Sequence, residues 1–86
     1  MELEYSDDSL KDLQKFEKQL QAFFIRHVEK LQKMPPRRHM RHGLPWHVEN
    51  VTQQARLLYK EKEGVLQIVR CFATHKEYER WYNSMR

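Results

Sequence analysis

The sequence lacks the features of disulfide-rich, secreted and membrane-spanning proteins. One of its 86 residues is cysteine, which excludes an internal disulfide and a cysteine-rich zinc site. No apolar run approaches the roughly 18 to 20 residues of a membrane span, and the first residues show no signal-peptide pattern. A second core would need roughly 50 residues of its own. We therefore expect one cytoplasmic domain spanning residues 1–86, with no membrane partner.

Several catalytic and cofactor motifs are also missing. With only two glycines the chain has no glycine-rich phosphate loop, and it has no nucleophile elbow. His39 and His42 are three residues apart, but no carboxylate or cysteine pair accompanies them, so we expect no metal and no cofactor. Cys71 lies in the apolar run 65–72, which favours a buried structural thiol over a nucleophile.

Charge is present but unevenly distributed. Sixteen Lys and Arg against twelve Asp and Glu give a net charge of +4, and residues 30–48 contain no acid at all. The cations and histidines of this segment are Lys30, Lys33, Arg37, Arg38, Arg41, His39, His42 and His47. Such a segment can bind phosphates, attract an acidic protein, or serve only as a solvated loop. Charge alone leaves these three alternatives open.

The first half of the chain predicts a strand followed by a helical hairpin. Residues 1–5 alternate apolar and acidic side chains, as in a half-buried strand, and residues 6–9 (Ser-Asp-Asp-Ser) are favoured helix N-caps. Apolar residues then recur every three or four positions through Lys33. We expect a break near residues 17–19, because a single helix this long would project beyond so small a core. Pro35 and Pro36 end the helix.

The second half predicts three strands and a closing helix. Residues 46–51, 55–60 and 65–72 are rich in strand-forming residues, and residues 61–64 supply a turn with Gly64. Thr74 and Glu77 have the spacing of a capping box before a helix at 76–83. The sequence thus predicts an α+β fold in the order β-α-α-β-β-β-α: an N-terminal strand, an α-hairpin, an antiparallel three-strand meander and a C-terminal helix.

Arg56 is the most unusual residue of the predicted sheet. Alternation places Ala55, Leu57 and Tyr59 on one face, and Arg56 with Leu58 on the other. An arginine in the middle of a sheet needs an acid, such as Glu49 on a neighbouring strand, or an external anion such as phosphate. The pattern does not choose between them. Arg70 alternates with Cys71 and could lie on either face, because register decides.

The closing helix carries aromatic residues on one side. Tyr78, Trp81 and Tyr82 share a helix face, with His75 and Lys76 at its start. We expect Trp81 or Tyr78 to dock on the sheet and one tyrosine to stay partly exposed. An exposed tyrosine beside cations could stack an RNA base or move a proton in phosphodiester transfer.

The element order and three short stretches resemble the RelE/ParE toxin superfamily, in particular its ribosome-dependent mRNA endonuclease branch of RelE, YoeB and HigB. Residues 54–59 (Gln-Ala-Arg-Leu-Leu-Tyr) are similar to the family's Tyr-Arg-Leu-Val-Tyr strand. Residues 41–45 (Arg-His-Gly-Leu-Pro) look like its glycine-containing turn, and residues 74–78 (Thr-His-Lys-Glu-Tyr) are similar to a run near the end of HigB-like members. The resemblance covers nearly the whole chain and implies a single RelE-like toxin domain.

The resemblance implies site residues. The family's active-site arginine corresponds to Arg56. Alignment on RelE points to Lys76 and Tyr82, whereas alignment on HigB points to His75 and Tyr78. His47 and Glu49 fall where RelE carries two lysines, a departure that removes cations but could supply a proton acceptor. Four basic residues would bind ribosomal or messenger RNA: Lys33, Arg37, Arg38 and Arg41.

The function implied is that of a toxin in a type II toxin–antitoxin system. It would cleave mRNA on the ribosome without a metal, using the RNA 2'-hydroxyl as nucleophile, and thereby inhibit translation. Its partners would be a cognate antitoxin, the ribosome and mRNA. The alternative is a non-catalytic binding module on the same scaffold, either a ParE-like gyrase inhibitor or an inactive homologue that binds antitoxin.

Overall fold

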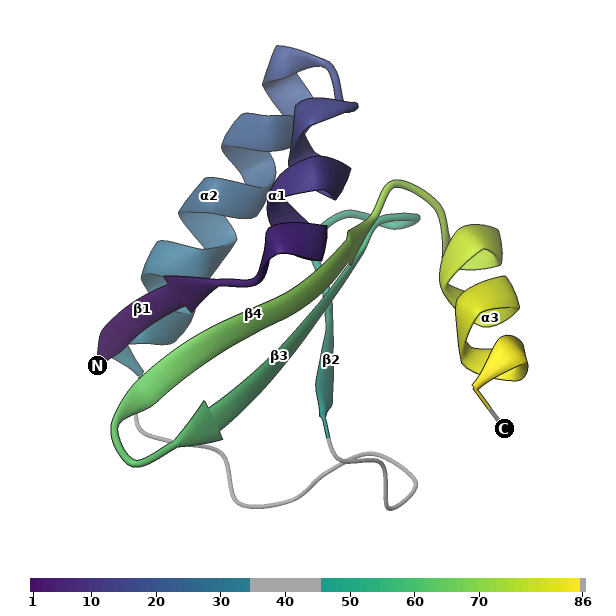
Figure 1. The fold of residues 1–86 in the computed structure, drawn as a ribbon. Coiled ribbons are helices and arrows are strands. Elements are labelled where there is room, and N and C mark those ends of the chain that lie inside the picture. The colour runs from purple at the N-terminus through teal and green to yellow at the C-terminus, as the bar shows by residue number, and fades with distance from the viewer. Residues whose placement is uncertain (35–45, 86) are drawn as a thin grey trace.

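The protein has the predicted α+β order of elements (Figure 1). The structure is a computed structural model that describes residues 1–34 and 46–85. Its elements are β1 (Glu2–Tyr5), α1 (Asp7–Gln14), α2 (Lys18–Lys33), β2 (His47–Asn50), β3 (Arg56–Lys62), β4 (Val65–Phe72) and α3 (His75–Ser84). The predicted fold class is therefore confirmed.

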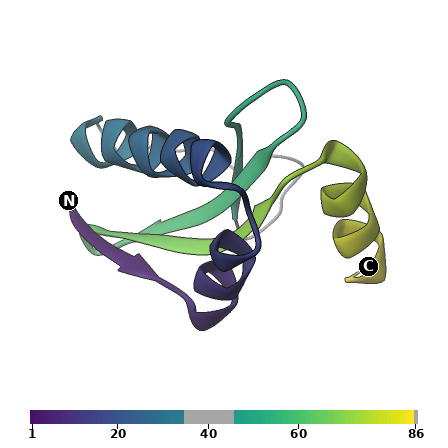
Figure 2. The ribbon, with the colours of Figure 1, turned by 90° about the horizontal axis from the view of Figure 1, so that it is seen from above.

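The described strands form one four-stranded sheet in the order β1-β4-β3-β2. β1 runs parallel to β4, whereas β2, β3 and β4 form the predicted antiparallel meander. α2 packs on one face of this sheet and α3 lies on the other side, far from both N-terminal helices (Figures 1 and 2). Each sheet face is thus covered by a different part of the chain.

The helix boundaries follow the predicted signals. Ser6 is the N-cap of α1, and its Oγ accepts a hydrogen bond of 3.0 Å from the Ser9 backbone amide. The helical segment is interrupted between Gln14 and Lys18, close to the predicted position. Phe16 lies in this interruption and packs on Phe24 of α2, with 5.4 Å between ring centroids. The break lets α2 fold back over the sheet.

A two-residue turn joins β3 to β4. Glu63 and Gly64 have φ angles of 50° and 78°. Two consecutive positive φ angles are typical of the type I′ turn, whose twist matches that of the flanking strands. The strand therefore continues to Lys62, two residues beyond the predicted end, before the chain reverses.

The larger core lies between the sheet and α2. Leu57 and Tyr59 are fully buried in it, and Leu58 lies on the opposite face, as alternation predicts. The buried members of this core are Phe24, Val28, Leu31, Ala55, Leu57, Tyr59, Leu66, Ile68 and Cys71.

A β-bulge at Val69 changes the faces of β4. Leu58 pairs with Arg70 but Tyr59 pairs with Ile68, so Val69 is the extra residue. Strict alternation along β4 would place Ile68 on the face of Arg70 and Phe72. The bulge instead puts Ile68 in the same core as Cys71, where it is fully buried.

The smaller core lies on the α3 side of the sheet. Trp46, Leu58 and Phe72 are buried there, and five partly buried residues pack on them: Val48, Val69, Tyr78, Trp81 and Tyr82. No residue of α3 is fully buried. This helix is therefore held to the sheet by one aromatic side.

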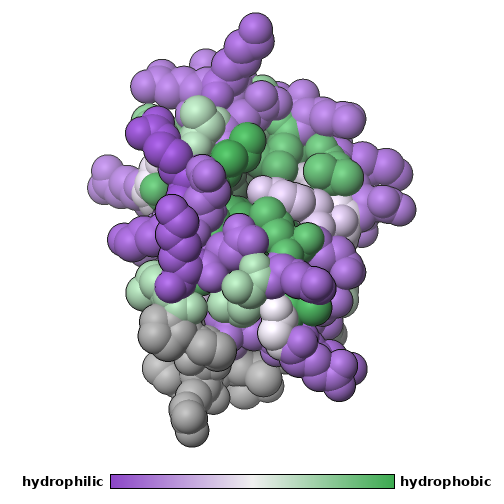
Figure 3. All heavy atoms as spheres, turned by 90° about the vertical axis from the view of Figure 1, so that its left-hand side faces the viewer, coloured by the Kyte–Doolittle hydropathy of each residue, from purple (hydrophilic) through white to green (hydrophobic). Residues whose placement is uncertain are grey.

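Apolar side chains also remain on the surface beside β1 and α2, where green spheres gather in Figure 3. Leu3 of β1 is 37% exposed and Ile25 of α2 is 47% exposed, so the half-buried pattern expected for Leu3 is only partly realised. In the part of the chain that the structure describes, no helix combines the length and apolar character needed to cross a membrane.

Candidate functional site

Arg56 opens β3 on the sheet face that α3 flanks. It pairs across the sheet with Asn50 of β2 and with Phe72 of β4. Its side chain is half-buried, and its Nη1 donates hydrogen bonds of 3.1 Å to the carbonyl oxygens of Gln53 and Ala55. Among residues 1–34 and 46–85, no carboxylate forms an ion pair with Arg56. Pairing with Glu49, one of the two alternatives that the sequence left open, is therefore not formed.

Glu49 and His47 lie on the opposite face of the sheet. Glu49 pairs across from Leu57, and its Oε2 is 3.7 Å from Nε2 of His27 on α2. His47 is buried and stacks on Tyr59, with ring centroids 5.0 Å apart. The structure does not bring either residue together with Arg56, because the sheet lies between them.

Asn50 and Val48 occupy the corresponding positions on the Arg56 face. The antiparallel register sets Asn50 directly opposite Arg56, and alternation along β2 then places Val48 on the same side. The family resemblance pointed instead to their neighbours His47 and Glu49, which lie on the other face. Which face of the sheet a β2 residue occupies depends on the register of β2 with β3. The turn at residues 51–55 sets that register.

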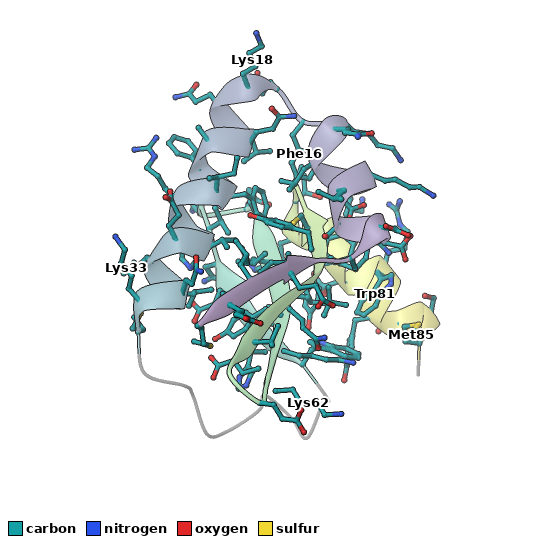
Figure 4. The ribbon with its side chains drawn as sticks, turned by 60° about the vertical axis from the view of Figure 1, so that its left-hand side comes forward. Phe16, Lys18, Lys33, Lys62, Trp81 and Met85 are labelled. Carbon is teal, nitrogen blue, oxygen red and sulfur yellow. The ribbon has the colours of Figure 1, made fainter. Side chains whose placement is uncertain are left out.

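Aromatic residues of α3 form a platform that packs on Phe72, the cross-strand neighbour of Arg56. Phe72, the cross-strand partner of Arg56, lies 5.9 Å from Tyr78 and 5.7 Å from Trp81 between ring centroids. Tyr78 in turn stacks on Tyr82 at 6.2 Å with an interplanar angle of 19°. Both tyrosines are half-buried, so the predicted docking of this helix face with partial exposure is confirmed. Trp81 is labelled in Figure 4.

His75 and Lys76 begin α3 and are exposed. The helix starts as predicted, because Oγ1 of Thr74 accepts a hydrogen bond of 3.1 Å from the Glu77 amide. Nε2 of His75 is 2.8 Å from Oε1 of Glu79, and its ring centroid lies 6.5 Å from that of Tyr78. An imidazole and an ammonium therefore stand at the end of α3 that follows β4.

Of the predicted RNA-binding cations, only Lys33 is described. It ends α2, is exposed, and projects outward at the base of the helix in Figure 4. Arg37, Arg38 and Arg41 lie outside the described residues, as do both prolines after the helix and the glycine-containing turn at 41–45.

Arg70 has a structural partner that the sequence did not indicate. Its Nε and Nη2 donate to Oδ2 and Oδ1 of Asp12 on α1, at 2.7 and 3.0 Å. The hydrogen bonds to the Asp12 carboxylate raise the pKa of Arg70 above its usual value. This guanidinium also lies 5.0 Å from the Phe72 ring centroid. Arg70 thus stays cationic, but its Nε and Nη2 are both hydrogen-bonded to Asp12.

We find no candidate metal centre in the described ranges, where no three His, Cys, Asp or Glu side chains cluster closely enough to hold an ion. His39 and His42 lie outside those ranges. The described site therefore offers a guanidinium, an aromatic platform, an ammonium and an imidazole. These groups can bind a phosphate, stack a base and exchange a proton.

Comparison with known proteins shows similarity in structure only. No protein-family model matches the chain, and no curated protein matches it in sequence. Among solved structures, the isolated RelE toxin of E. coli superposes with a TM-score of 0.72 at 13% identity, over 99% of this chain and 98% of RelE.

Two further structures have the same fold. A YoeB/ParE toxin from Agrobacterium tumefaciens matches with a TM-score of 0.65 at 16% identity, over 83% of this chain and 95% of its own. A chain of the intact E. coli RelBE toxin–antitoxin complex matches with a TM-score of 0.68 at 13% identity, over 81% and 92% of the two chains. The protein therefore has the RelE-like fold.

Proposed function

We propose that this chain, which has the fold of the RelE/ParE toxins, is the toxin of a type II toxin–antitoxin system and cleaves mRNA on the ribosome. One observation carries the proposal: Arg56 has no carboxylate partner among the described residues, and Phe72, its cross-strand neighbour, packs on the aromatic side chains of α3. A half-buried guanidinium of this kind suits an external phosphate.

The proposed reaction uses the RNA 2'-hydroxyl as nucleophile. Its oxygen attacks the adjacent phosphorus, the P–O5' bond breaks, and a proton passes from the 2'-hydroxyl to the leaving 5'-oxygen. The products end in a 2',3'-cyclic phosphate, which water can open to a 3'-phosphate, and in a 5'-hydroxyl. The protein must hold the RNA in line and stabilise the phosphorane charge, so the chemistry requires no metal.

The residues divide among these tasks. Arg56 would stabilise the phosphorane, with Lys76 as a second cation. His75, Tyr78 or Tyr82 would move the protons, and one of the tyrosines would stack a base. Lys33, Arg37, Arg38 and Arg41 would bind ribosomal or messenger RNA through phosphates. His47 and Glu49 are left out of this set, because they lie on the far side of the sheet.

An antitoxin is part of the proposal. It is supported by the similarity to the toxin of the RelBE complex and by the exposed apolar residues Leu3, Leu10 and Ile25. Such residues are the ones a protein partner would cover. The site of action would be the cytoplasm, where translated mRNA is found.

Replacing Arg56 by Ala should slow cleavage by about 100- to 1,000-fold while leaving the fold intact, because its side-chain hydrogen bonds among the described residues go only to backbone carbonyls. The test is cell-free translation with mapping of mRNA 5' ends, with and without ribosomes. Arg56→Lys should retain little activity, since an ammonium lacks the planar fork of arginine. Lys62→Ala, at the other end of β3, is the matched control (Figure 4). Equal cutting by wild type and Arg56→Ala would refute the site.

A second candidate function is favoured by the neutral side chains of β2. Val48 and Asn50 face the site where a nuclease would benefit from cations. A ParE-like gyrase inhibitor, or a homologue that only binds antitoxin, needs no such charge. Inhibition of DNA gyrase together with intact mRNA would favour this reading over the nuclease.

A further inference from the structure

The turn between β2 and β3 is held by the side chain of Thr52. Its Oγ1 accepts hydrogen bonds of 3.0 Å from the Ala55 amide and 3.2 Å from the Gln54 amide. The Val51 amide donates to the Ala55 carbonyl at 3.0 Å and closes the turn. A threonine hydroxyl that accepts from amides two and three residues later fixes the backbone locally.

The carbonyl oxygens of this turn converge on one nitrogen of Arg56. Nη1 donates to the carbonyls of Gln53 and Ala55 at 3.1 Å each, and the Thr52 carbonyl lies at 3.5 Å. All three carbonyls belong to the segment that the Thr52 hydroxyl fixes. The turn therefore holds the Nη1 end of the guanidinium through hydrogen bonds to its carbonyl oxygens.

The opposite edge of the guanidinium has its donors available. Arginine carries five N–H donors, two of them on Nη1. Within the described residues, Nε and Nη2 of Arg56 have no hydrogen-bond acceptor in the protein. These two nitrogens form the fork that binds two oxygens of one phosphate.

We propose that Thr52 is a positioning residue that sets the orientation of Arg56. Its hydroxyl holds the 52–55 turn in the shape whose carbonyls bind Nη1, and the Nε–Nη2 edge is thereby presented to an RNA phosphate. Arg56 is then ordered before RNA arrives, which avoids the cost of ordering a long side chain on binding. The role in cleavage rests on the proposed function, whereas the orientation of Arg56 does not.

The activity test compares Thr52→Val, which loses the hydroxyl at constant shape, with Thr52→Ser, which keeps it. In single-turnover cleavage on ribosomes, Thr52→Val should slow the reaction by about 10- to 100-fold with the apparent KM changed less than about twofold. Thr52→Ser should cleave at nearly the wild-type rate. Gln54→Ala, whose side chain takes part in none of these bonds, is the control within the turn.

Two results separate positioning from general destabilisation. In an Arg56→Ala background, adding Thr52→Val should change the residual rate by less than about twofold, because the group that it positions is gone. An equal fall in both backgrounds would overturn the inference. Should Thr52→Val fail to fold, Thr52→Ala takes its place.

A measurement independent of activity is the ¹⁵N NMR of arginine side chains. In the wild type and in Thr52→Ser, the bonds at Nη1 should slow rotation of the Arg56 guanidinium, so that its Nη groups give separate signals. In Thr52→Val the signals should merge. Unchanged Arg56 signals in Thr52→Val would overturn the inference even if wild-type protein cuts mRNA. If wild-type protein cleaves no mRNA but its Arg56 signals still depend on the Thr52 hydroxyl, the proposed function is wrong and the inference about Thr52 stands.

Discussion

Cys71 lies in β4 within the larger core, and burial raises the pKa of its thiol to about 12. The nearby Asp12 carboxylate contributes to this rise, and Arg70 opposes it. A thiol is a nucleophile only as the thiolate. Cys71 therefore acts as an apolar core residue, as its position in an apolar run predicts.

The raised pKa of the Cys71 thiol makes the free energy of unfolding fall at alkaline pH. Between pH 9 and about 12 the unfolded chain loses this proton and the folded chain keeps it, so stability falls by up to about 1.4 kcal/mol per pH unit. Below pH 9 both states hold the proton and the effect vanishes. Urea unfolding at pH 8, 9, 10 and 11, for wild type and Cys71→Ala, measures it as the difference between the two slopes. Parallel slopes would contradict the raised pKa.

The sheet face on which a side chain lies could be predicted from the sequence only where alternation within its own strand determines it. Alternation within residues 55–60 predicted that Arg56 and Leu58 oppose Leu57, because the period of a strand is fixed. Glu49 was different, since its face depends on how β2 pairs with β3. That register is set by the 51–55 turn, whose hydrogen bonds are not visible in the order of residues.

At the scale of elements, α1 covers the part of β4 that β1 leaves open. β1 pairs with β4 as far as Ile68, and the next edge groups of β4 bind α1 and its cap instead. Ser6 Oγ donates to the Val69 carbonyl at 2.8 Å, and Oδ2 of Asp12 accepts from the Cys71 amide at 3.0 Å. Asp12 thus satisfies both a strand edge and Arg70.

Removing the Asp12 carboxylate should destabilise the fold markedly. Asp12→Ala leaves the Arg70 guanidinium and the Cys71 amide without this acceptor in a partly buried site, at a cost of about 2 to 4 kcal/mol. Asp12→Asn should cost less, because an amide oxygen can still accept from Cys71. Urea denaturation gives both values, with the exposed Gln14→Ala on the same helix as control. A loss below about 0.5 kcal/mol in Asp12→Ala would show that this contact contributes little.

Element boundaries were predictable where a local signal exists. Ser6, Thr74 and Gly64 mark caps and a turn through their own chemistry, and each acts at the expected position. The bulge at Val69 has no such signal. It depends on how β3 and β4 fit against the two cores, and the pairing of Asp12 with Arg70 likewise joins residues that only the tertiary fold brings together.

For the molecule as a whole, the two faces of the sheet are unequally covered. Among the described residues, nine are buried in the core on the α2 side and three in the core on the α3 side, and α3 itself has no fully buried residue. The candidate site is thus built on the less firmly packed side. Elements with few buried contacts open locally at lower free energy than the core does.

Hydrogen exchange should show this asymmetry. Backbone amides of α3 should exchange faster than those of β4 by about two orders of magnitude, because α3 can detach without exposing the larger core. Amides of α2 near Phe24 and Val28, which are buried in that core, serve as the reference and should match β4. Equal protection of α3 and β4 would mean that the helix opens only with global unfolding.

The parallel pairing of β1 with β4 also determines when the sheet can form during synthesis. Glu2 pairs with Val65, so the first strand must wait for a partner synthesised 63 residues later. At translation rates of 5 to 20 residues per second, that interval is about 3 to 13 s. Arg56 is made before β4 and finds its neighbour Phe72 only after the sheet closes. The sheet around Arg56 therefore cannot assemble until β4 has been synthesised, so a nascent chain that lacks β4 has no complete candidate site.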